Sequence, residues 1–184
     1  MLLALLIAAI TMPHATPDTT VTLGRSERDL TGDGIPEVLT LTGVGQTVDD
    51  LTVTFAIQSS GRTLYSKSGR WTRATFSGRR PISDVELRTR RNEFSSSFFA
   101  DSKFMSPEGF VSWLRSSARL HIPLIPEVIS HEMTPRDSTR ASRIWQEMQT
   151  AGITVFRFSL GGDGITVIGW STTDQRFYGL LECC

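Results

Sequence analysis

The chain has 184 residues, of which 39% are hydrophobic and 21% charged, and its 19 basic residues balance its 19 acidic ones. This length fits a single domain, and the composition excludes a disordered chain, which is poor in hydrophobic residues and high in net charge. A net charge of zero also excludes a field that attracts nucleic acid over the whole surface, so we expect no nucleic-acid partner.

An apolar run occupies residues 2–10, and polar composition begins near Ala15. The run is shorter than the ~20 residues that a membrane-spanning helix requires. An apolar run of this length is typical of a secretory signal peptide, although it lacks a preceding Lys or Arg, and a buried strand is the alternative. We therefore expect a signal peptide at residues 1–15 and a single α+β domain at residues 18–184. The protein would be secreted or periplasmic and not membrane-spanning.

The two cysteines, Cys183 and Cys184, are adjacent at the end of the chain. No disulfide between them closes a long loop, so burial must hold the fold together. We expect either free thiols at the end of a terminal strand or a disulfide-linked dimer through Cys183 or Cys184. A redox-active pair is the third alternative.

Alternation of apolar and polar residues predicts strands in the first third of the chain. Apolar residues fall at every second position over residues 51–57 and again over residues 38–42, which is the pattern of half-buried strands. Turn residues follow the first of these segments and favour a return strand over residues 63–66. With an earlier strand over residues 21–28, these segments predict an antiparallel β meander.

The middle of the chain carries start and stop signals for helices. A Ser-x-x-Glu capping box at residues 83–86 predicts a helix that runs to about residue 94. Pro107 is favourable at the first position of a second helix, and a short helix is expected over residues 127–131. The segment Asp137–Gly152 predicts the clearest helix, with an acidic cap, apolar residues at helical spacing and a terminal glycine.

The end of the chain returns to strand patterns, over residues 154–160, 165–170 and 176–183. The glycine-rich segment Gly161–Gly164 predicts the turn between the first two. The expected fold class is α+β, with an antiparallel β meander at the N-terminus, a helical middle and a three-stranded antiparallel C-terminal segment. We expect the two sets of strands to join in one antiparallel sheet covered by helices.

The acidic segment between the first two strands is the best candidate for a binding site. Calcium takes about six to eight oxygen ligands, which an acidic loop supplies from alternate side chains and from a backbone carbonyl. The donors would be the side chains of Asp29, Thr31, Asp33 and Glu37 and the carbonyl of Ile35. The sequence therefore predicts a calcium site.

A tight turn is the alternative interpretation of this segment. Asp29 and Asp33 would then accept hydrogen bonds from nearby backbone amides. A turn alone requires no third acid, and the position of Glu37 therefore favours calcium. Asp49 and Asp50 would add ligands if the meander brought the next loop alongside.

Residues Asp29–Thr40 resemble the calcium loop of FG-GAP and VCBS-type repeats, and the first nine positions of an EF-hand or dockerin loop. In those families the first, third, fifth and ninth positions donate side-chain oxygens and the seventh donates its carbonyl. Thr31 stands where Asp or Asn is usual, and Thr40 stands where an EF-hand has its bidentate Glu. These departures favour a strand-flanked loop over a helix-loop-helix. With three carboxylates instead of four or five, we expect a weak, structural calcium site with a dissociation constant of about 10⁻⁴ to 10⁻³ M.

Two further groups of residues are candidate sites. His121 and His131 match no zinc spacing, and Glu132 follows His131 without the second His of the helical zinc protease motif. Five arginines are concentrated between residues 79 and 91, where intervening acids favour a solvated face over an anion-binding groove. They are Arg79, Arg80, Arg88, Arg90 and Arg91.

Several aromatic residues also lie near this basic stretch. Core packing is the more frequent role for such residues, and an exposed binding surface is the alternative. They are Trp71, Phe94, Phe98, Phe99 and Phe104.

We expect an exported module without enzymatic activity, with a role in binding or surface structure. One weak structural calcium ion would brace it, and its partner would be an unknown protein or glycan. The alternative is an exported hydrolase of unrecognised family that uses His131 or His121.

Overall fold

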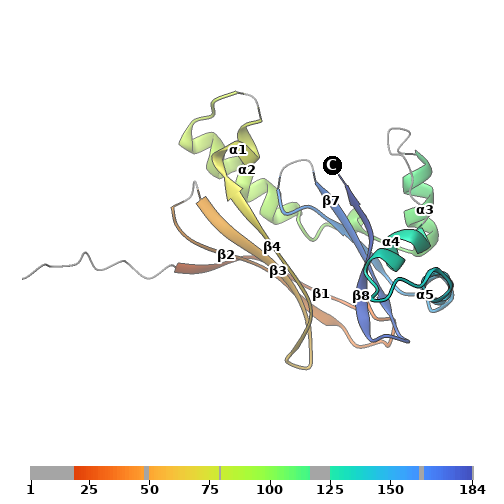
Figure 1. The fold of residues 1–184 in the computed structure, drawn as a ribbon. Helices are drawn as coiled ribbons and strands as arrows, with labels where there is room; N and C mark the ends of the chain where they lie inside the picture. The colour runs from red at the N-terminus through yellow and green to blue at the C-terminus, as the bar shows by residue number, and fades with distance from the viewer. Residues whose placement is uncertain (1–18, 48–49, 79, 117–124, 162–163, 184) are drawn as a thin grey trace, which may run out of the picture.

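The computed structural model describes residues 19–47, 50–78, 80–116, 125–161 and 164–183 (Figure 1). The expected signal peptide, His121 and Cys184 lie outside these ranges. Within them, no helix is both long enough and apolar enough to cross a membrane.

The first four strands form an antiparallel sheet, the N-terminal sheet, in the order of the chain. Alternation explains why one face of β3 is buried, since Leu51, Val53, Phe55 and Ile57 point inward and the residues between them are more exposed. The meander is therefore present, with a fourth strand much longer than expected. The strands are β1 (Thr19–Arg28), β2 (Glu37–Thr47), β3 (Asp50–Ser59) and β4 (Arg62–Thr72).

The C-terminal sheet has four strands, and the expectation of three was wrong. The additional strand, β5 (Phe104–Met105), pairs with β6 (Val155–Phe158), which in turn pairs with β7 (Ile165–Ser171), and β7 with β8 (Arg176–Cys183). With two residues, β5 is too short for any alternation to be visible in the sequence. Its position is fixed by Phe104, whose ring stacks on Phe156 with centroids 4.6 Å apart.

The two sets of strands do not join into one sheet, which corrects a second expectation. Instead the sheets pack face to face, and apolar residues of β2 and β3 meet apolar residues of β6, β7 and β8 in one core. Phe55 is at its centre, fully buried, with its ring centroid 4.7 Å from that of Phe158 and 5.6 Å from that of Phe98. Both sheets carry an apolar face, and stacking the two faces buries more apolar surface than an edge-to-edge pairing would.

Three helices cover the other face of the C-terminal sheet (Figure 1). This second core explains why β7 is buried at nearly every position: its residues alternate between the N-terminal sheet on one side and the helices on the other. Ile168 belongs to the first core and Val167 to the second. The covering helices are α3 (Pro107–Ser116), α4 (Ile125–His131) and α5 (Ser138–Thr150).

The remaining helices follow β4 at one end of the N-terminal sheet (Figure 1). They are α1 (Arg73–Ser77), α2 (Asp84–Ser97) and the 3₁₀ turn η1 (Asp101–Lys103). Ser83 caps α2 by accepting the backbone N–H of Glu86 at 3.2 Å. The reciprocal half of the predicted capping box is not formed, because the Glu86 carboxylate binds Arg80 and Arg90 instead.

Candidate functional site

The acidic loop, residues 29–36 together with Glu37, leaves β1 and enters β2 through a tight turn. Gly32 and Gly34 have φ values of 76° and 83°, which side-chain-bearing residues rarely adopt. The Asp29 carboxylate closes the turn by accepting the backbone N–H of Gly32 at 2.7 Å and that of Gly34 at 2.9 Å. Asp33 accepts the backbone N–H of Ile35 at 2.8 Å. These are the bonds expected of the turn interpretation.

Glu37 differs from the other two acids because its side chain is buried, with 1% of the residue exposed. Its carboxylate accepts the backbone N–H of Leu30 at 2.8 Å and the Thr31 hydroxyl at 3.1 Å. Among the described residues, no Lys or Arg forms an ion pair with Glu37, Asp29 or Asp33. Three negative groups therefore occupy one loop without a positive partner from the chain.

All five predicted donors lie in this loop, but at different depths. Thr31 and Glu37 are buried, whereas Asp33 and Ile35 are exposed and Asp29 is half-buried. In the described part of the chain, no three His, Cys, Asp or Glu side chains are grouped closely enough to hold a metal ion. In this conformation the carboxylates of the loop accept hydrogen bonds from backbone N–H groups or from a hydroxyl. A calcium shell would need these carboxylates and, in addition, the oxygens of Thr31 and Ile35.

Asp50 does not lie near the acidic loop. It begins β3, at the opposite end of β2, because successive connections of an antiparallel meander alternate between the two ends of the sheet. There it pairs with Arg70 through two bonds of 2.6 and 2.5 Å, which hold the pKa of Asp50 below its usual value. The suggestion that Asp50 completes a calcium shell was therefore wrong, and Asp49 lies outside the described residues.

A hollow of about 550 Å³ adjoins the acidic loop, and we call it the loop cleft. It is built where three connections from both sheets converge at one end of the molecule. Sequence reasoning did not identify the cleft residues outside the acidic loop as site residues, because they come together only when the two sheets pack. The residues that line it are Thr31, Asp33 and Glu37 from the β1–β2 connection and the start of β2, Ser59, Ser60, Arg62 and Leu64 from the β3–β4 hairpin, Trp170 from β7, and Thr172 and Gln175 from the β7–β8 turn.

Two residues at the loop cleft hold unusual backbone conformations. Ser60, in the β3–β4 turn, and Gln175, in the β7–β8 turn, have φ values of 49° and 50°, and both line the cleft. Within the described ranges, they are the only non-glycine residues with positive φ. Such conformations concentrate at binding and catalytic sites, where surrounding structure maintains them.

A second hollow, the α4–α5 cleft, has a volume of about 500 Å³ and lies between the α4–α5 connection and the β7–β8 hairpin. Its charged side chains bind one another. Glu132 accepts the Gly179 backbone N–H at 2.8 Å and an Arg176 N–H at 3.2 Å. Asp174 accepts hydrogen bonds from Arg140 and from the Tyr178 hydroxyl. These bonds attach the hairpin to the helices.

Burial and pairing shift the pKa values in the α4–α5 cleft in opposite directions. Burial raises the pKa of Glu132, and the bonds from Gly179 and Arg176 only partly oppose this. Burial also disfavours ionised Asp174, but hydrogen bonds from Tyr178 and Arg140 outweigh it and hold the pKa of Asp174 below its usual value. Burial, followed by the bond to Asp174, raises the pKa of Tyr178 to about 12.

His131 takes no part in either cleft. It is the last residue of α4, its side chain is exposed, and it lines neither hollow. His121, the other histidine considered for hydrolysis, lies outside the described residues.

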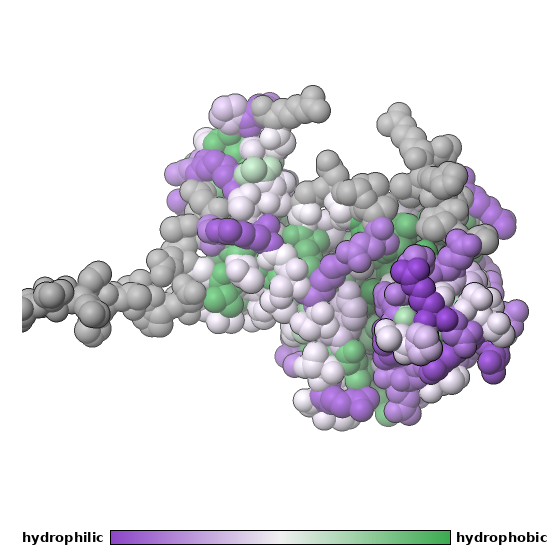
Figure 2. All heavy atoms as spheres, in the orientation of Figure 1, coloured by the Kyte–Doolittle hydropathy of each residue, from purple (hydrophilic) through white to green (hydrophobic). Residues whose placement is uncertain are grey.

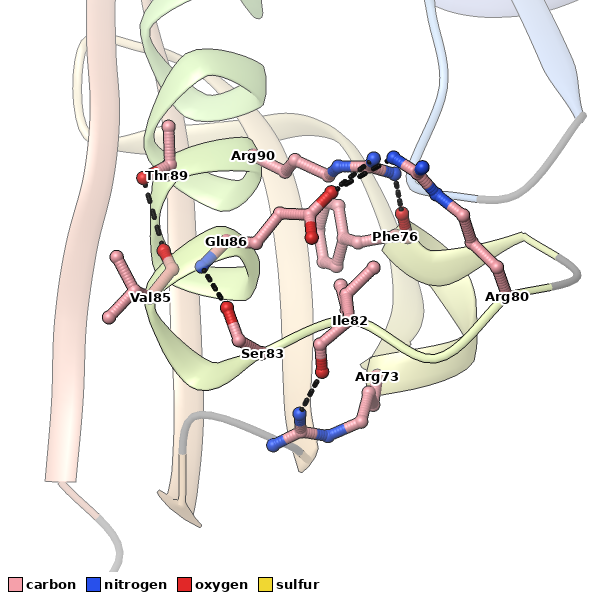
Figure 3. Close-up of polar contacts among 9 residues, drawn as sticks. All are labelled: Arg73, Phe76, Arg80, Ile82, Ser83, Val85, Glu86, Thr89 and Arg90. Atoms are coloured by element: carbon pink, nitrogen blue, oxygen red, sulfur yellow. Dashed lines mark hydrogen bonds and ion pairs between the residues drawn. The ribbon is translucent and has the colours of Figure 1, made fainter.

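Two arginines of the basic stretch, Arg80 and Arg90, are compensated locally (Figure 3). Arg90 donates to the Phe76 carbonyl at 2.6 Å and to the Glu86 carboxylate at 2.6 Å. Arg80 donates to the same carboxylate at 3.2 Å. The two guanidinium groups therefore converge on Glu86 and join the helices, while Arg79 lies outside the described residues.

The aromatic residues near this stretch belong to the core. Trp71 and Phe98 are buried, and Phe94, Phe99 and Phe104 pack against the same cluster. On the face shown in Figure 2, hydrophilic residues gather over α4 and α5, and hydrophobic residues form small separate areas.

Comparison of the chain with models of known families, with curated proteins and with solved structures finds no match. The assignment of a function therefore depends on the acidic loop and the two clefts.

Proposed function

We propose that the chain is an exported binding module, without enzymatic activity, in which one weakly bound calcium ion braces the acidic loop. The observation that carries the proposal is the burial of the Glu37 carboxyl group, which is 1% exposed and has no cationic partner among the described residues. A buried carboxylate is costly unless hydrogen bonds and an opposite charge offset the loss of water. Leu30 and Thr31 supply the hydrogen bonds but no positive charge.

Asp29 and Asp33 increase the need for a cation, because two more carboxylates share the same short loop. The donor set consists of oxygens alone, which suits a hard cation such as calcium and not the nitrogen and sulfur ligands typical of zinc. Asp29, Thr31, Asp33 and Glu37 would hold the ion with the Ile35 carbonyl. The ion would supply positive charge and fix the loop, with no chemical step of its own.

The position of the loop gives the calcium ion a role in binding. Thr31, Asp33 and Glu37 form one wall of the loop cleft, so an ion that fixes the loop also fixes the shape of the cleft. Export is the part of the proposal that depends on the apolar run at residues 2–10 alone. It would expose a weak site to the millimolar calcium found outside cells.

Isothermal titration calorimetry tests the metal site. Calcium is titrated into the chelator-treated protein, and the heat of binding is measured. We expect one site with a dissociation constant of about 10⁻⁴ to 10⁻³ M. Asp33→Asn should weaken binding by about tenfold or more, because it removes one ligand charge. Glu108→Gln, which neutralises an exposed acid on α3, should leave the affinity unchanged. Absence of any saturable heat, or equal effects of the two variants, would contradict the proposal.

A further inference from the structure

Trp170 presents a hydrogen-bond donor that has no partner among the residues that the structure describes. The residue is 7% exposed and lines the loop cleft. Its indole N–H makes no hydrogen bond to any described residue, whereas the N–H of Trp71 donates to the Leu160 carbonyl at 2.7 Å. Because no fully buried side-chain nitrogen or oxygen in the described ranges lacks a partner, the Trp170 N–H must reach accessible space. The loop cleft is the described hollow that Trp170 borders.

Two further polar groups of the loop cleft are also free of partners. The Arg62 guanidinium and the Gln175 amide make no hydrogen bond or ion pair with other described residues, and both residues are exposed. Together with Trp170 they offer several donors and one amide acceptor around a single hollow. The carboxylate of Asp33 adds a second acceptor, because only one of its oxygens is used within the loop.

The α4–α5 cleft shows the opposite arrangement and serves as an internal comparison. There the carboxylates of Glu132 and Asp174 already accept hydrogen bonds from Gly179, Arg176, Arg140 and Tyr178. A ligand would have to break these bonds to bind. In the loop cleft a ligand could bind the side chains of Trp170, Arg62 and Gln175 without breaking a bond between described residues, which favours the loop cleft as the binding site.

The charges of the loop cleft narrow the chemistry of its ligand. Asp33 and Glu37 repel an anion, and Arg62 repels a cation, so a neutral molecule with many hydroxyl groups is the best match. The hydroxyls of a sugar both donate and accept, as the free groups around Trp170 require. One calcium ion on the acidic loop would bring the summed charge of Asp29, Asp33, Glu37 and Arg62 from −2 to zero, which suits a neutral ligand.

We propose that the loop cleft binds a short neutral glycan, through the Trp170 indole N–H, the Arg62 guanidinium and the Gln175 amide. The inference depends on the proposed function in one respect, namely that calcium holds the acidic wall of the cleft. It specifies the ligand class of that binding module.

An array of immobilised neutral glycans, probed with the purified protein in millimolar calcium, identifies a ligand for titration. Titration is then followed through the indole N–H signals of ¹⁵N-labelled protein, which contains four tryptophans. The signal that Trp170→Phe removes should shift on addition of the glycan. The Trp71 signal should stay in place, because its N–H is bound to Leu160 inside the core.

Three variants test the contacts of the cleft. Trp170→Phe, Arg62→Ala and Gln175→Gly should each weaken glycan binding by about tenfold, since each removes a hydrogen-bonding group. Glycine at position 175 retains the positive φ of the turn. Arg88→Ala removes an exposed arginine of α2 that does not line the cleft, and should change affinity by less than about twofold.

The outcomes separate the glycan inference from the calcium proposal. No binding to any neutral glycan, or binding that leaves the Trp170 signal unmoved, overturns the inference even if calcium stabilises the protein. A shift of the Trp170 signal by free amino acids, and not by glycans, also overturns it, in favour of a zwitterionic ligand. Glycan binding that shifts Trp170 equally with and without calcium supports the glycan site and contradicts the calcium brace.

Discussion

Glu37 accepts the backbone N–H of Leu30 at 2.8 Å, which ties the first residue of β2 to the second residue of the acidic loop. Leu30 is completely buried and belongs to the core between the sheets. The loop is therefore anchored in the core at one side and open to the loop cleft at the other. A change at the Glu37 carboxyl group should therefore change the stability of the domain through its bond to Leu30.

Replacement of Glu37 by alanine should reduce the free energy of unfolding by about 2 to 4 kcal/mol, since it leaves the Leu30 N–H buried without an acceptor. Glu37→Gln retains an oxygen that can accept this bond and should cost clearly less in the absence of calcium. Urea denaturation in the presence of chelator measures both values. Equal losses for the two variants would show that the hydrogen bond to Leu30 is not what stabilises the loop.

The contact between the two sheets should depend strongly on Phe55. Phe55→Ala empties a fully buried position surrounded by Phe98, Phe156 and Phe158, and should cost about 3 to 5 kcal/mol. Val85→Ala, at a site that is 73% exposed, should change stability by less than about 0.5 kcal/mol. Similar melting temperatures for the two variants would contradict face-to-face packing around Phe55.

The short strand β5 should depend on the stacking of Phe104 against Phe156. Phe104→Ala removes the stacked ring and should speed hydrogen exchange at β5 and at the edge of β6, while β7 and β8 keep their protection. Amide exchange followed by NMR measures this. Unchanged protection at Val155 and Phe156 would count against β5 as part of the sheet.

Glu132 should make stability depend on pH in a defined direction. Burial raises the pKa of Glu132, so the folded chain retains this proton at pH values where the unfolded chain has released it. The corresponding stabilisation is complete below the unfolded pKa and is lost as pH rises through the folded pKa. Glu132→Gln cannot ionise and keeps an acceptor for the Gly179 N–H.

The stability of the original chain relative to Glu132→Gln should accordingly fall as pH rises above about 4, where an unfolded Glu begins to ionise. Denaturant unfolding of both proteins at several pH values gives this difference directly. A constant difference would mean that pairing with Arg176 cancels the effect of burial on the pKa of Glu132, and a difference that grows with pH would mean that pairing outweighs burial; either result would contradict the prediction.

Local sequence patterns predicted the helices and strands whose conformation depends mainly on neighbouring residues. Alternation located β3, and the cap at Asp137 with apolar residues at helical spacing located α5. The short elements β5 and α1 were missed, because two and five residues are too few for a periodic pattern. The separation of the two sheets was also missed, since it depends on contacts such as Phe55 with Phe158, which are distant in the sequence.

The candidate site shows the same limit. The acidic loop is continuous in sequence, so its proposed calcium donors could be named from spacing alone. The loop cleft is assembled from Arg62, Trp170 and Gln175, which belong to different strands and turns. Ser60 belongs to the turn that the sequence predicted after residues 51–57, but Gln175 has positive φ without being glycine, asparagine or aspartate, so no turn signal marked it. The thiol-linked dimer stays a prediction, because Cys184 lies outside the described residues.

A melting curve recorded first in chelator and then in millimolar calcium tests the central claim most directly. We predict a rise in Tm of a few degrees with calcium, because an ion that binds only the folded chain stabilises it by mass action. Asp33→Ala should abolish the rise, and magnesium at the same concentration should not reproduce it. An identical Tm in chelator and in calcium would contradict the account and leave the acidic loop as a hydrogen-bonded turn.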